Sequence, residues 1–270
     1  MESFDKPCIE LTKAAFRYIY IMRYYAEGRD CTAEYRLTDL MKKYRNEWKY
    51  CCTDADLVRV EHRIGAVLQK DVHAGENGRY GVHSLYFDDL NNTCAMETEA
   101  GNGLRFKYRI RYYGNNPDFL RLERKEKRYG GCFKASCRIT RGEFEALTAG
   151  DVSGLLYDET KPLLRRFAAD ILMRGFTPRV IVDYERIAYV EPIANVRITL
   201  DLNIAVSKEY GRFLNGDYLK VPLLSKGRHV LEVKFDDVFP GYLKQSVYEC
   251  NLQQRSFSKY GLGFELLRSM

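Results

Sequence analysis

The sequence predicts an α+β domain that is built mainly from antiparallel β-sheet. Several segments alternate between charged and apolar residues, as strands do when one face of a sheet is polar and the other is buried. Apolar residues at helical spacing appear in segments that lie between these strands. Roughly eight strands with helices inserted between pairs favour a single domain dominated by sheet. The chain has 270 residues, of which 46% are hydrophobic, so it can bury a core.

The first half of this domain is expected to contain a helix between its first two strands. Thr53 is a good N-cap, acidic residues occupy the first turn, and apolar residues at helical spacing continue to about Lys70. Gly101-Asn102-Gly103 closes a polar connection before the next strand, and Gly130-Gly131 marks a hairpin turn. The expected strands are 44–52, 80–88, 104–113, 119–128 and 132–140.

The second half is expected to begin with two helices and to return to strands. Residues 140–149 and 161–174 have helical character, and Pro162 lies in a first turn, where proline is tolerated. A turn with Pro192 and Asn195 joins two of the later strands. The expected strands are 179–190, 196–206 and 229–235, and a last helix is expected from Tyr242 to Cys250.

Residues 1–40 differ from the rest, because they carry scattered Tyr and Arg without a clean period. Two interpretations stay open for them: a weakly packed N-terminal extension, and a short docking helix over 9–26. The main domain is expected to span residues 41–270.

Composition narrows the class of protein. The eight cysteines form no C-x-x-C pair and match no zinc spacing, and residues 1–30 lack the apolar region of a secretory signal. Reduced thiols and a cytoplasmic location are therefore expected. No run of roughly eighteen apolar residues occurs, so direct membrane insertion is not expected. The net charge of +6 is a mild excess, so the position of the charges matters more than their sum.

The strand expected over 104–113 is the most informative. Successive strand side chains point to opposite faces, so Arg105, Lys107, Arg109 and Arg111 share one face. Four like charges repel one another unless solvent or an anion compensates them. A solvated outer face explains any single strand of this kind, whereas a sheet that closes on itself would turn such faces inward around a wet, basic channel. The other charged faces are Arg121, Glu123, Lys125 and Lys127; Lys134, Ser136 and Arg138; Tyr184 and Arg186; Arg197, Thr199 and Asp201; and Glu232, Lys234 and Asp236.

A basic channel suits phosphate groups. Guanidinium groups bind phosphate oxygens in bidentate fashion, and lysines supply point charges. Glu47, Glu123 and Glu232 are the carboxylates beside these basic residues. A hard divalent cation prefers such oxygens and can bridge them to phosphate, but an internal salt bridge to a neighbouring Lys or Arg is the alternative for each Glu.

An ordered series of short motifs runs through the chain. They are YRNEWKY at 44–50, SLYFD at 84–88, KYRIRYYG at 107–114, LERK at 122–125, DYER at 183–186, RITLD at 197–201, EVKF at 232–235 and FSKY at 257–260. Over about residues 41–262 this series resembles the VTC domain, the polyphosphate polymerase domain of the vacuolar transporter chaperone family, within the triphosphate tunnel metalloenzymes. The resemblance implies a closed eight-stranded antiparallel β-tunnel with helices packed outside. It also implies that the terminal phosphate of ATP is added to growing inorganic polyphosphate, with Mn²⁺ or Mg²⁺.

The resemblance also assigns roles by position. Glu232 matches the metal-binding Glu, and the charged faces add Glu47 and Glu123 as further candidate ligands. The basic residues that match the catalytic phosphate-binding set are Lys49, Arg109, Arg111, Lys125, Lys134 and Arg186. Further expected substrate-binding residues are Arg197, Ser258 and Lys259, which match the family, and Lys107, Arg138 and Lys234, which share the charged faces.

Two positions depart from the pattern. Ser256 stands where the better-known polymerase of the family is expected to carry a basic residue, and Arg45 replaces a Glu of related tunnel phosphatases. The missing carboxylate favours holding a long anion over hydrolysing a short one. A tunnel triphosphatase acting on a nucleoside or organic triphosphate and a non-catalytic polyphosphate-binding protein remain alternatives. Nucleic-acid binding is disfavoured, because no recognised motif for it appears.

Overall fold

The structure is a computed structural model that describes residues 44–71, 75, 77–248, 250 and 252–270. Residues from Tyr44 to Met270 belong to one compact unit. The extension expected over residues 1–40 lies outside the described residues, and so do the first three residues of the expected domain, 41–43.

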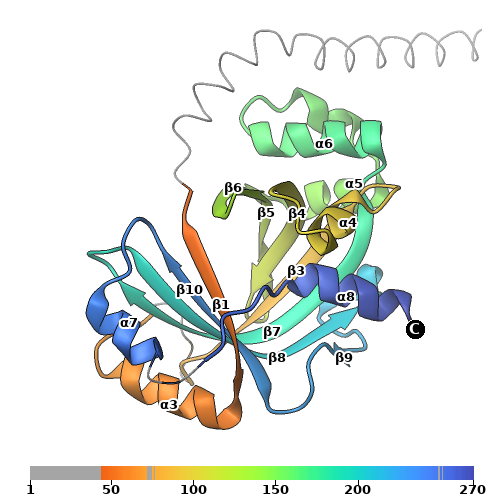
Figure 1. The fold of residues 1–270 in the computed structure, drawn as a ribbon. Coiled ribbons are helices and arrows are strands. Elements are labelled where there is room, and N and C mark those ends of the chain that lie inside the picture. Colours follow the sequence, from red (N-terminus) through yellow and green to blue (C-terminus); the bar gives the residue numbers. More distant parts are fainter. Residues whose placement is uncertain (1–43, 72–74, 76, 249, 251) are drawn as a thin grey trace, which may run out of the picture. The chain divides into compact units, whose positions relative to one another are not determined.

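One antiparallel sheet dominates this unit (Figure 1). Eight strands follow one another in the order β1-β10-β8-β7-β3-β4-β5-β6, and two short strands pair at the side, β2 with β7 and β9 with β8. The strands are β1 (Asn46–Thr53), β2 (Gln69–Lys70), β3 (Tyr80–Asp88), β4 (Leu104–Tyr113), β5 (Asn116–Arg128), β6 (Gly131–Ile139), β7 (Thr177–Glu191), β8 (Val196–Ser207), β9 (Val221–Pro222) and β10 (Arg228–Phe235).

The predicted α+β class and antiparallel sheet are confirmed, with two differences in detail. Across the described part of the chain the sheet has ten strands instead of eight, because β2 and β9 add to the main path. The sheet is also not closed by a continuous ladder. Its edges meet at one bridge beside β1 and β6, where the backbones of Arg45 and Cys132 exchange two hydrogen bonds of 3.0 Å. The sheet therefore curls into a tunnel-like trough that is joined edge to edge at a single point.

Most of the helices cover the outside of the curled sheet, and two of them lie beside its inner cavity (Figure 1). They are α3 (Asp54–Gly65), α4 (Thr93–Glu99), α5 (Arg141–Ala149), α6 (Pro162–Arg174), α7 (Gly241–Tyr248) and α8 (Lys259–Arg268), with short 3₁₀ helices at η2 (Ser153–Tyr157) and η3 (Tyr210–Asn215). α3 contacts α7 and packs on β1 and β10, whereas α5 and α6 lie beside β5 and β6. α4 and α8 contact each other beside β3, β4, β7 and β8.

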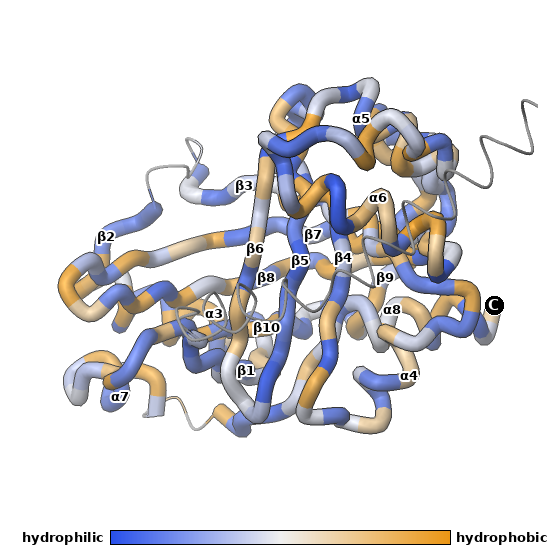
Figure 2. Tube along the Cα trace, turned by 90° about the horizontal axis from the view of Figure 1, so that it is seen from above, coloured by the Kyte–Doolittle hydropathy of each residue, from blue (hydrophilic) through white to orange (hydrophobic). Residues whose placement is uncertain are grey.

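Apolar strand residues face these helices. Tyr50, Ile64 and Leu231 are almost fully buried in the layer between α3 and the sheet. On β4, Tyr108 is fully buried and stacks on Phe167 of α6, with ring centroids 4.2 Å apart. Since neighbouring residues of a strand point to opposite faces, the charged residues of β4 point inward. Figure 2 shows a largely hydrophilic β5 beside it.

The expected helix after the first strand is shorter than predicted. α3 ends at Gly65 instead of near Lys70, because Gln69 and Lys70 pair with β7 as β2. Its start agrees with the prediction: the Thr53 side chain accepts from the Asp56 backbone, and the Asp56 side chain accepts from the Thr53 backbone.

Helices α4 and α8 were not predicted from the sequence, because tertiary contacts hold them. Asn92 precedes α4 in a left-handed conformation, without a side-chain cap. The carboxylate of Asp88 accepts from the amides of Cys94 and Ala95 instead, each at 2.9 Å. α8 contains two glycines, which weaken helix propensity, but a Cβ on Gly263 would come within 2.7 Å of Val206 Cγ1. Close packing on β8 therefore explains this glycine.

Candidate active site

The inner face of the sheet lines a cavity of about 820 Å³. Side chains from β1, β3, β4, β5, β7 and β10 form its wall, and residues 254–262 lead along it into α8. Residues of α4 and α8 form its rim, where Met96 and Leu262 are exposed. The cavity is therefore a charged interior that opens between two helices.

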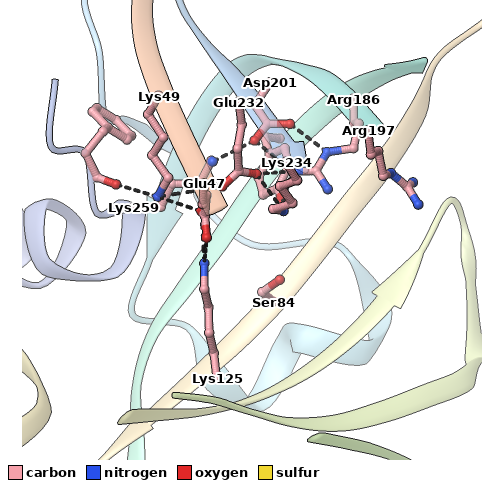
Figure 3. Close-up of polar contacts among 12 residues, drawn as sticks. Glu47, Lys49, Ser84, Lys125, Arg186, Arg197, Asp201, Glu232, Lys234 and Lys259 are labelled. Atoms are coloured by element: carbon pink, nitrogen blue, oxygen red, sulfur yellow. Dashed lines mark hydrogen bonds and ion pairs between the residues drawn. The ribbon is translucent and has the colours of Figure 1, made fainter. Parts of the chain in front are cut away.

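Two buried carboxylates lie together in this interior. Glu47 of β1 accepts hydrogen bonds from Lys125 of β5, with Nζ at 2.7 and 3.0 Å from its two oxygens, and this pair crosses the interior (Figure 3). Glu232 of β10 accepts from Lys234 at 2.9 Å. The Nζ of Lys49 lies 3.2 Å from Glu47 Oε1 and 3.7 Å from Glu232 Oε1. One ammonium group is thus shared by both carboxylates.

A third carboxylate, Asp201 of β8, is fully buried next to this pair. Arg186 of β7 donates to its two oxygens at 2.6 and 2.8 Å, and Lys259 Nζ lies 2.6 Å from Oδ2. The guanidinium of Arg186 also lies 3.7 Å from Glu232. Arg186 therefore connects the two parts of the cluster.

The fourth carboxylate, Glu123 of β5, lies behind two arginines of β4. Arg109 Nε donates to Glu123 Oε2 at 2.6 Å, and its other arm donates to the Tyr86 hydroxyl at 2.9 Å. Arg111 donates to the Ser84 hydroxyl at 2.9 Å and lies 3.9 Å from Glu123. Because Glu123 is fully buried, it holds both guanidinium groups in place from below.

These residues form what we term the inner cluster, in which each carboxylate is shared by at least two basic side chains. Burial and Glu232 favour protonation of Glu47, but Lys125 and Lys49 lower its pKa to about 2. Burial also favours protonation of Glu232, but Lys234 holds its pKa well below the ordinary value. Burial would lower the pKa of Lys125, but the carboxylate of Glu47 outweighs burial and raises this pKa above its ordinary value. The cluster is therefore ionised at neutral pH and keeps an excess of positive charge.

Lys107 of β4 differs from the cations of the inner cluster. Its Nζ donates to the Ser258 hydroxyl at 2.9 Å and lies 5.2 Å from the centre of the Tyr260 ring. Within the described part of the chain, no carboxylate lies within 4.0 Å of it. Burial, followed by repulsion from Lys49 and Lys125, lowers the pKa of Lys107 to about 7. Its charge at neutral pH therefore depends on whether an anion is present.

The carboxylate pair offers oxygen ligands to a divalent cation. No group of three or more His, Cys, Asp or Glu side chains suited to a metal occurs among the described residues. Glu47 and Glu232 alone supply carboxylate oxygens that share one ammonium. Mg²⁺ is commonly held by one or two carboxylates together with substrate phosphates and water. The two residues fit such an ion, provided that a bound phosphate completes its coordination.

Most of the site residues expected from the sequence come together in this cavity. Those that line it are Glu47, Lys49, Lys107, Arg109, Arg111, Lys125, Arg186, Glu232, Lys234, Ser258 and Lys259. Glu123, Lys134, Arg138 and Arg197 do not line it.

Each of these four residues has another partner. Glu123 is covered by the arginines described above and accepts from Lys134 at 3.0 Å, which fits the salt-bridge interpretation of this Glu. Arg138 lies over the Phe119 ring, 4.7 Å from its centre, and lines a separate, smaller cavity. Arg197 lies 2.6 Å from Asp71, and Figure 3 shows it directed away from the carboxylate pair. Strand alternation alone does not separate these positions from cavity positions.

Other cavity residues were not predicted as site residues. Arg105 and Lys127 share the predicted charged faces and reach the cavity wall, so the alternation was a usable signal for them. Tyr86 and Tyr260 stack with ring centroids 5.2 Å apart, and the Tyr260 hydroxyl donates to Asp88 at 2.5 Å. Nothing in the sequence pattern distinguishes these tyrosines from ordinary core aromatics.

None of the helices among the described residues has the length and apolar character needed to cross a membrane. Arg45, at the position where the resemblance led us to expect a missing carboxylate, pairs with Asp236 at 2.9 Å and lies outside the cavity lining. This position thus adds no carboxylate to the site.

Comparisons with known proteins agree with this architecture. The family model of the VTC domain matches residues 44–268. None of the curated proteins compared with the chain matches it. A solved structure of a candidate adenylyl cyclase from Hippeastrum, described as having a dominant triphosphatase activity, is 15% identical with a TM-score of 0.51, over 83% of this chain and 95% of its own. A candidate adenylate cyclase from Bacillus halodurans is 12% identical with a TM-score of 0.45, over 80% and 95%.

Proposed function

Since the chain belongs to the VTC domain family, we propose that it is a polyphosphate polymerase, which transfers the terminal phosphate of ATP to a growing polyphosphate chain. The observation that carries this proposal is the inner cluster itself. Basic side chains of five strands and α8 surround two ionised carboxylates inside one cavity, and they outnumber the carboxylates there. A polyanion of phosphate groups supplies the missing negative charge.

The reaction requires positioning and charge compensation more than covalent chemistry by the protein. The bond between the terminal phosphorus of ATP and its bridging oxygen breaks, and a bond to a terminal oxygen of the acceptor chain forms. ADP leaves, and the chain is one phosphate longer. Arg109, Arg111 and Lys125 would hold the phosphates, and Lys49, Arg186 and Lys259 would neutralise charge on the transferred group.

A divalent cation fits this proposal. Glu47 and Glu232 would hold Mn²⁺ or Mg²⁺, which would supply positive charge to the phosphate oxygens. Lys49 lies between the two carboxylates, so a bound cation would displace its ammonium group. That group would then pair with the bound phosphates.

Hydrolysis of a triphosphate is the second candidate function. The Hippeastrum structure with the similar fold is described as having a dominant triphosphatase activity. The carboxylate pair could serve hydrolysis as well as transfer, because both reactions need the same metal and the same phosphate contacts. The Arg45–Asp236 pair, which leaves one carboxylate fewer for water activation, favours transfer.

The test is to incubate the purified protein with ATP and Mn²⁺ and to separate the products on a gel. The polymerase assignment predicts long polyphosphate from the wild type and none from Arg111→Ala. Free phosphate without polymer would instead indicate a triphosphatase.

Tight polyphosphate binding without either product would indicate a non-catalytic binding protein. If Arg109→Ala, Arg111→Ala and Lys259→Ala all left turnover and polyphosphate binding unchanged, the cavity would not be the site. A cytoplasmic location, with ATP and polyphosphate as the partners, belongs to the same proposal.

A further inference from the structure

A serine and a lysine meet inside the cavity, at the point where the last helix begins. Ser258 is the N-cap of α8, and its Oγ accepts a hydrogen bond from the Gly261 amide at 3.1 Å. The same Oγ lies 2.9 Å from Nζ of Lys107 on β4. Both side chains line the cavity that contains the inner cluster. A hydroxyl and an amine at hydrogen-bond distance are the elements of a nucleophile and its general base.

The surroundings of Lys107 favour the neutral form of its amine. The groups that face it from neighbouring elements are three cations, a thiol and an aromatic ring: Arg105 of β4, Lys49 of β1, Lys125 of β5, Cys94 of α4 and Tyr260 of α8. The ion pairs found among the described residues include none to Lys107. Since burial and these cations lower the pKa of Lys107 to about 7, much of the amine has a free lone pair near neutral pH.

Other serines at the cavity lack such a partner. Ser256 lines the same cavity but is exposed, and it makes no hydrogen bond to a lysine among the residues that the structure describes. Ser84, beside the inner cluster, accepts from Arg111 at 2.9 Å. A guanidinium group does not lose its proton in proteins, so Arg111 is no base for Ser84. The pairing of hydroxyl and titratable amine therefore singles out Ser258.

We propose that Ser258 accepts the terminal phosphate of ATP, and that Lys107 takes up the proton of its hydroxyl. This inference rests on the proposed function, because it needs ATP in the same cavity. The bond between the terminal phosphorus of ATP and its bridging oxygen breaks, and a bond from that phosphorus to Ser258 Oγ forms. ADP leaves, and the hydroxyl proton moves to Lys107 Nζ. The product is a phosphoserine beside a lysine cation.

The surroundings of Ser258 suit this product. Phosphoserine at a helix N-terminus is favoured, because the first amides and the helix dipole of α8 attract negative charge. Lys107 becomes an ammonium group beside the same oxygen. Lys49 is also close, since its Nζ donates to the backbone carbonyl of Phe257 at 2.8 Å. Two lysines and a helix N-terminus would therefore stabilise the phosphoryl group.

The experiment is to incubate the wild type with ATP and Mn²⁺ without added polyphosphate, to denature it, and to measure the mass of the protein and of its peptides. The wild type should gain one phosphoryl group on Ser258, and Ser258→Ala should gain none. Ser256→Ala is the matched control and should be modified like the wild type. The rate of modification should rise as the pH increases past about 7, because the neutral amine of Lys107 becomes more populated.

Substitutions of Lys107 separate proton transfer from binding. Lys107→Arg keeps a positive charge for the phosphates but cannot take up a proton at neutral pH. At saturating ATP it should modify Ser258 roughly a hundredfold more slowly, the size of effect that loss of a general base produces. Lys107→Met also lacks the base and should be equally slow, so the role stays testable if the larger Arg disturbs the fold. Thermal unfolding shows which variants are folded.

The outcomes separate this inference from the proposed function. Modification of Ser258 in the wild type that is lost in the folded Lys107 variants supports it. A wild type that binds ATP but stays unmodified would overturn it. Folded Lys107 variants that modify Ser258 at the wild-type rate would overturn it as well. A wild type that binds neither ATP nor triphosphate in a titration would refute the proposed function, and this inference would fall with it.

Discussion

The inner cluster and the outer end of the same cavity differ in how their positive charges are compensated. Inside, Glu47, Glu232, Asp201 and Glu123 each hold at least two basic side chains at fixed positions. Toward the rim, Arg105, Lys107 and Lys127 form no ion pair with a carboxylate among the described residues. One part of the sheet is thus organised by its own carboxylates, whereas the other leaves its cations without a close carboxylate.

This comparison has an energetic consequence. A buried carboxylate that is shared by several cations stabilises the fold through its position, so its removal leaves uncompensated buried charges. A buried cation without a carboxylate contributes repulsion instead, and its removal relieves that repulsion. The two regions should therefore respond in opposite directions to loss of a charged group.

The largest effect is expected at Glu123. Glu123→Gln removes the negative charge that holds Arg109, Arg111 and Lys134, and the buried cations then repel one another. We expect the free energy of unfolding to fall by about 3–5 kcal/mol. Urea denaturation measures this change. Glu145→Gln is the control, because its ion pair with Arg141 is largely exposed and should contribute less than about 1 kcal/mol.

If Glu123→Gln lowered the free energy of unfolding by no more than Glu145→Gln does, the inner cluster would not stabilise the fold. Added polyphosphate should restore part of the lost stability, since a bound anion compensates the same cations. Thermal unfolding with and without polyphosphate measures this recovery.

The next largest effect is expected for Lys107, whose removal should weaken ligand binding without lowering the stability of the fold. Lys107→Met keeps an apolar stem but removes the charge, so the free energy of unfolding should stay within about 1 kcal/mol or increase. Triphosphate and long polyphosphate should both bind roughly tenfold more weakly, because Lys107 lines the cavity beside the inner cluster. Calorimetric titration measures both affinities. A variant that unfolds like Glu123→Gln would show that Lys107 belongs with the inner residues.

The pH dependence of binding gives a smaller effect with a definite sign. The pKa of Lys107 is about 7 in the folded protein without ligand, against an ordinary value of 10.5. The charged amine binds the anion, so triphosphate affinity should fall as pH rises above about 7, by roughly tenfold in total once the amine is neutral. Lys107→Met should lose this slope, and comparison of the two proteins removes the titration of the phosphate itself.

The same residue gives the opposite trend for stability. Between about 7 and 10.5 the unfolded chain binds a proton that the folded protein has lost. The contribution of Lys107 to the free energy of unfolding therefore rises with pH in this window. Denaturation of the wild type and Lys107→Met at several pH values checks this. Parallel curves for the two proteins would contradict the uncompensated state of Lys107.

The sequence was sufficient for the strands and for the faces of their residues. The expected strands 80–88 and 104–113 agree with β3 and β4 residue for residue, because alternation and flanking turns define both ends. The alternation also placed Arg109, Arg111 and Lys125 on the charged faces of their two strands, and these residues line one cavity. The alternation of charged and apolar residues thus predicted the part of the site that depends only on the two-residue period of a strand.

Other features depended on contacts between distant residues. α4 begins where Asp88 accepts its amides, and α8 depends on close packing of Gly263 on Val206, so neither helix has a strong local signal. Glu123 and Glu232 look alike in sequence, yet only Glu232 lines the cavity, because Arg109 and Lys134 cover Glu123. Such differences depend on the register between strands, which the alternation within one strand does not reveal.

A crystal structure of the protein with triphosphate and Mn²⁺ tests most directly whether the inner cluster binds phosphate. We expect phosphate groups within hydrogen-bond distance of Arg111 and Lys259, and an anomalous manganese signal beside Glu47 and Glu232. Triphosphate bound elsewhere on the protein, with the inner cluster unchanged, would show that this cluster is not the phosphate site.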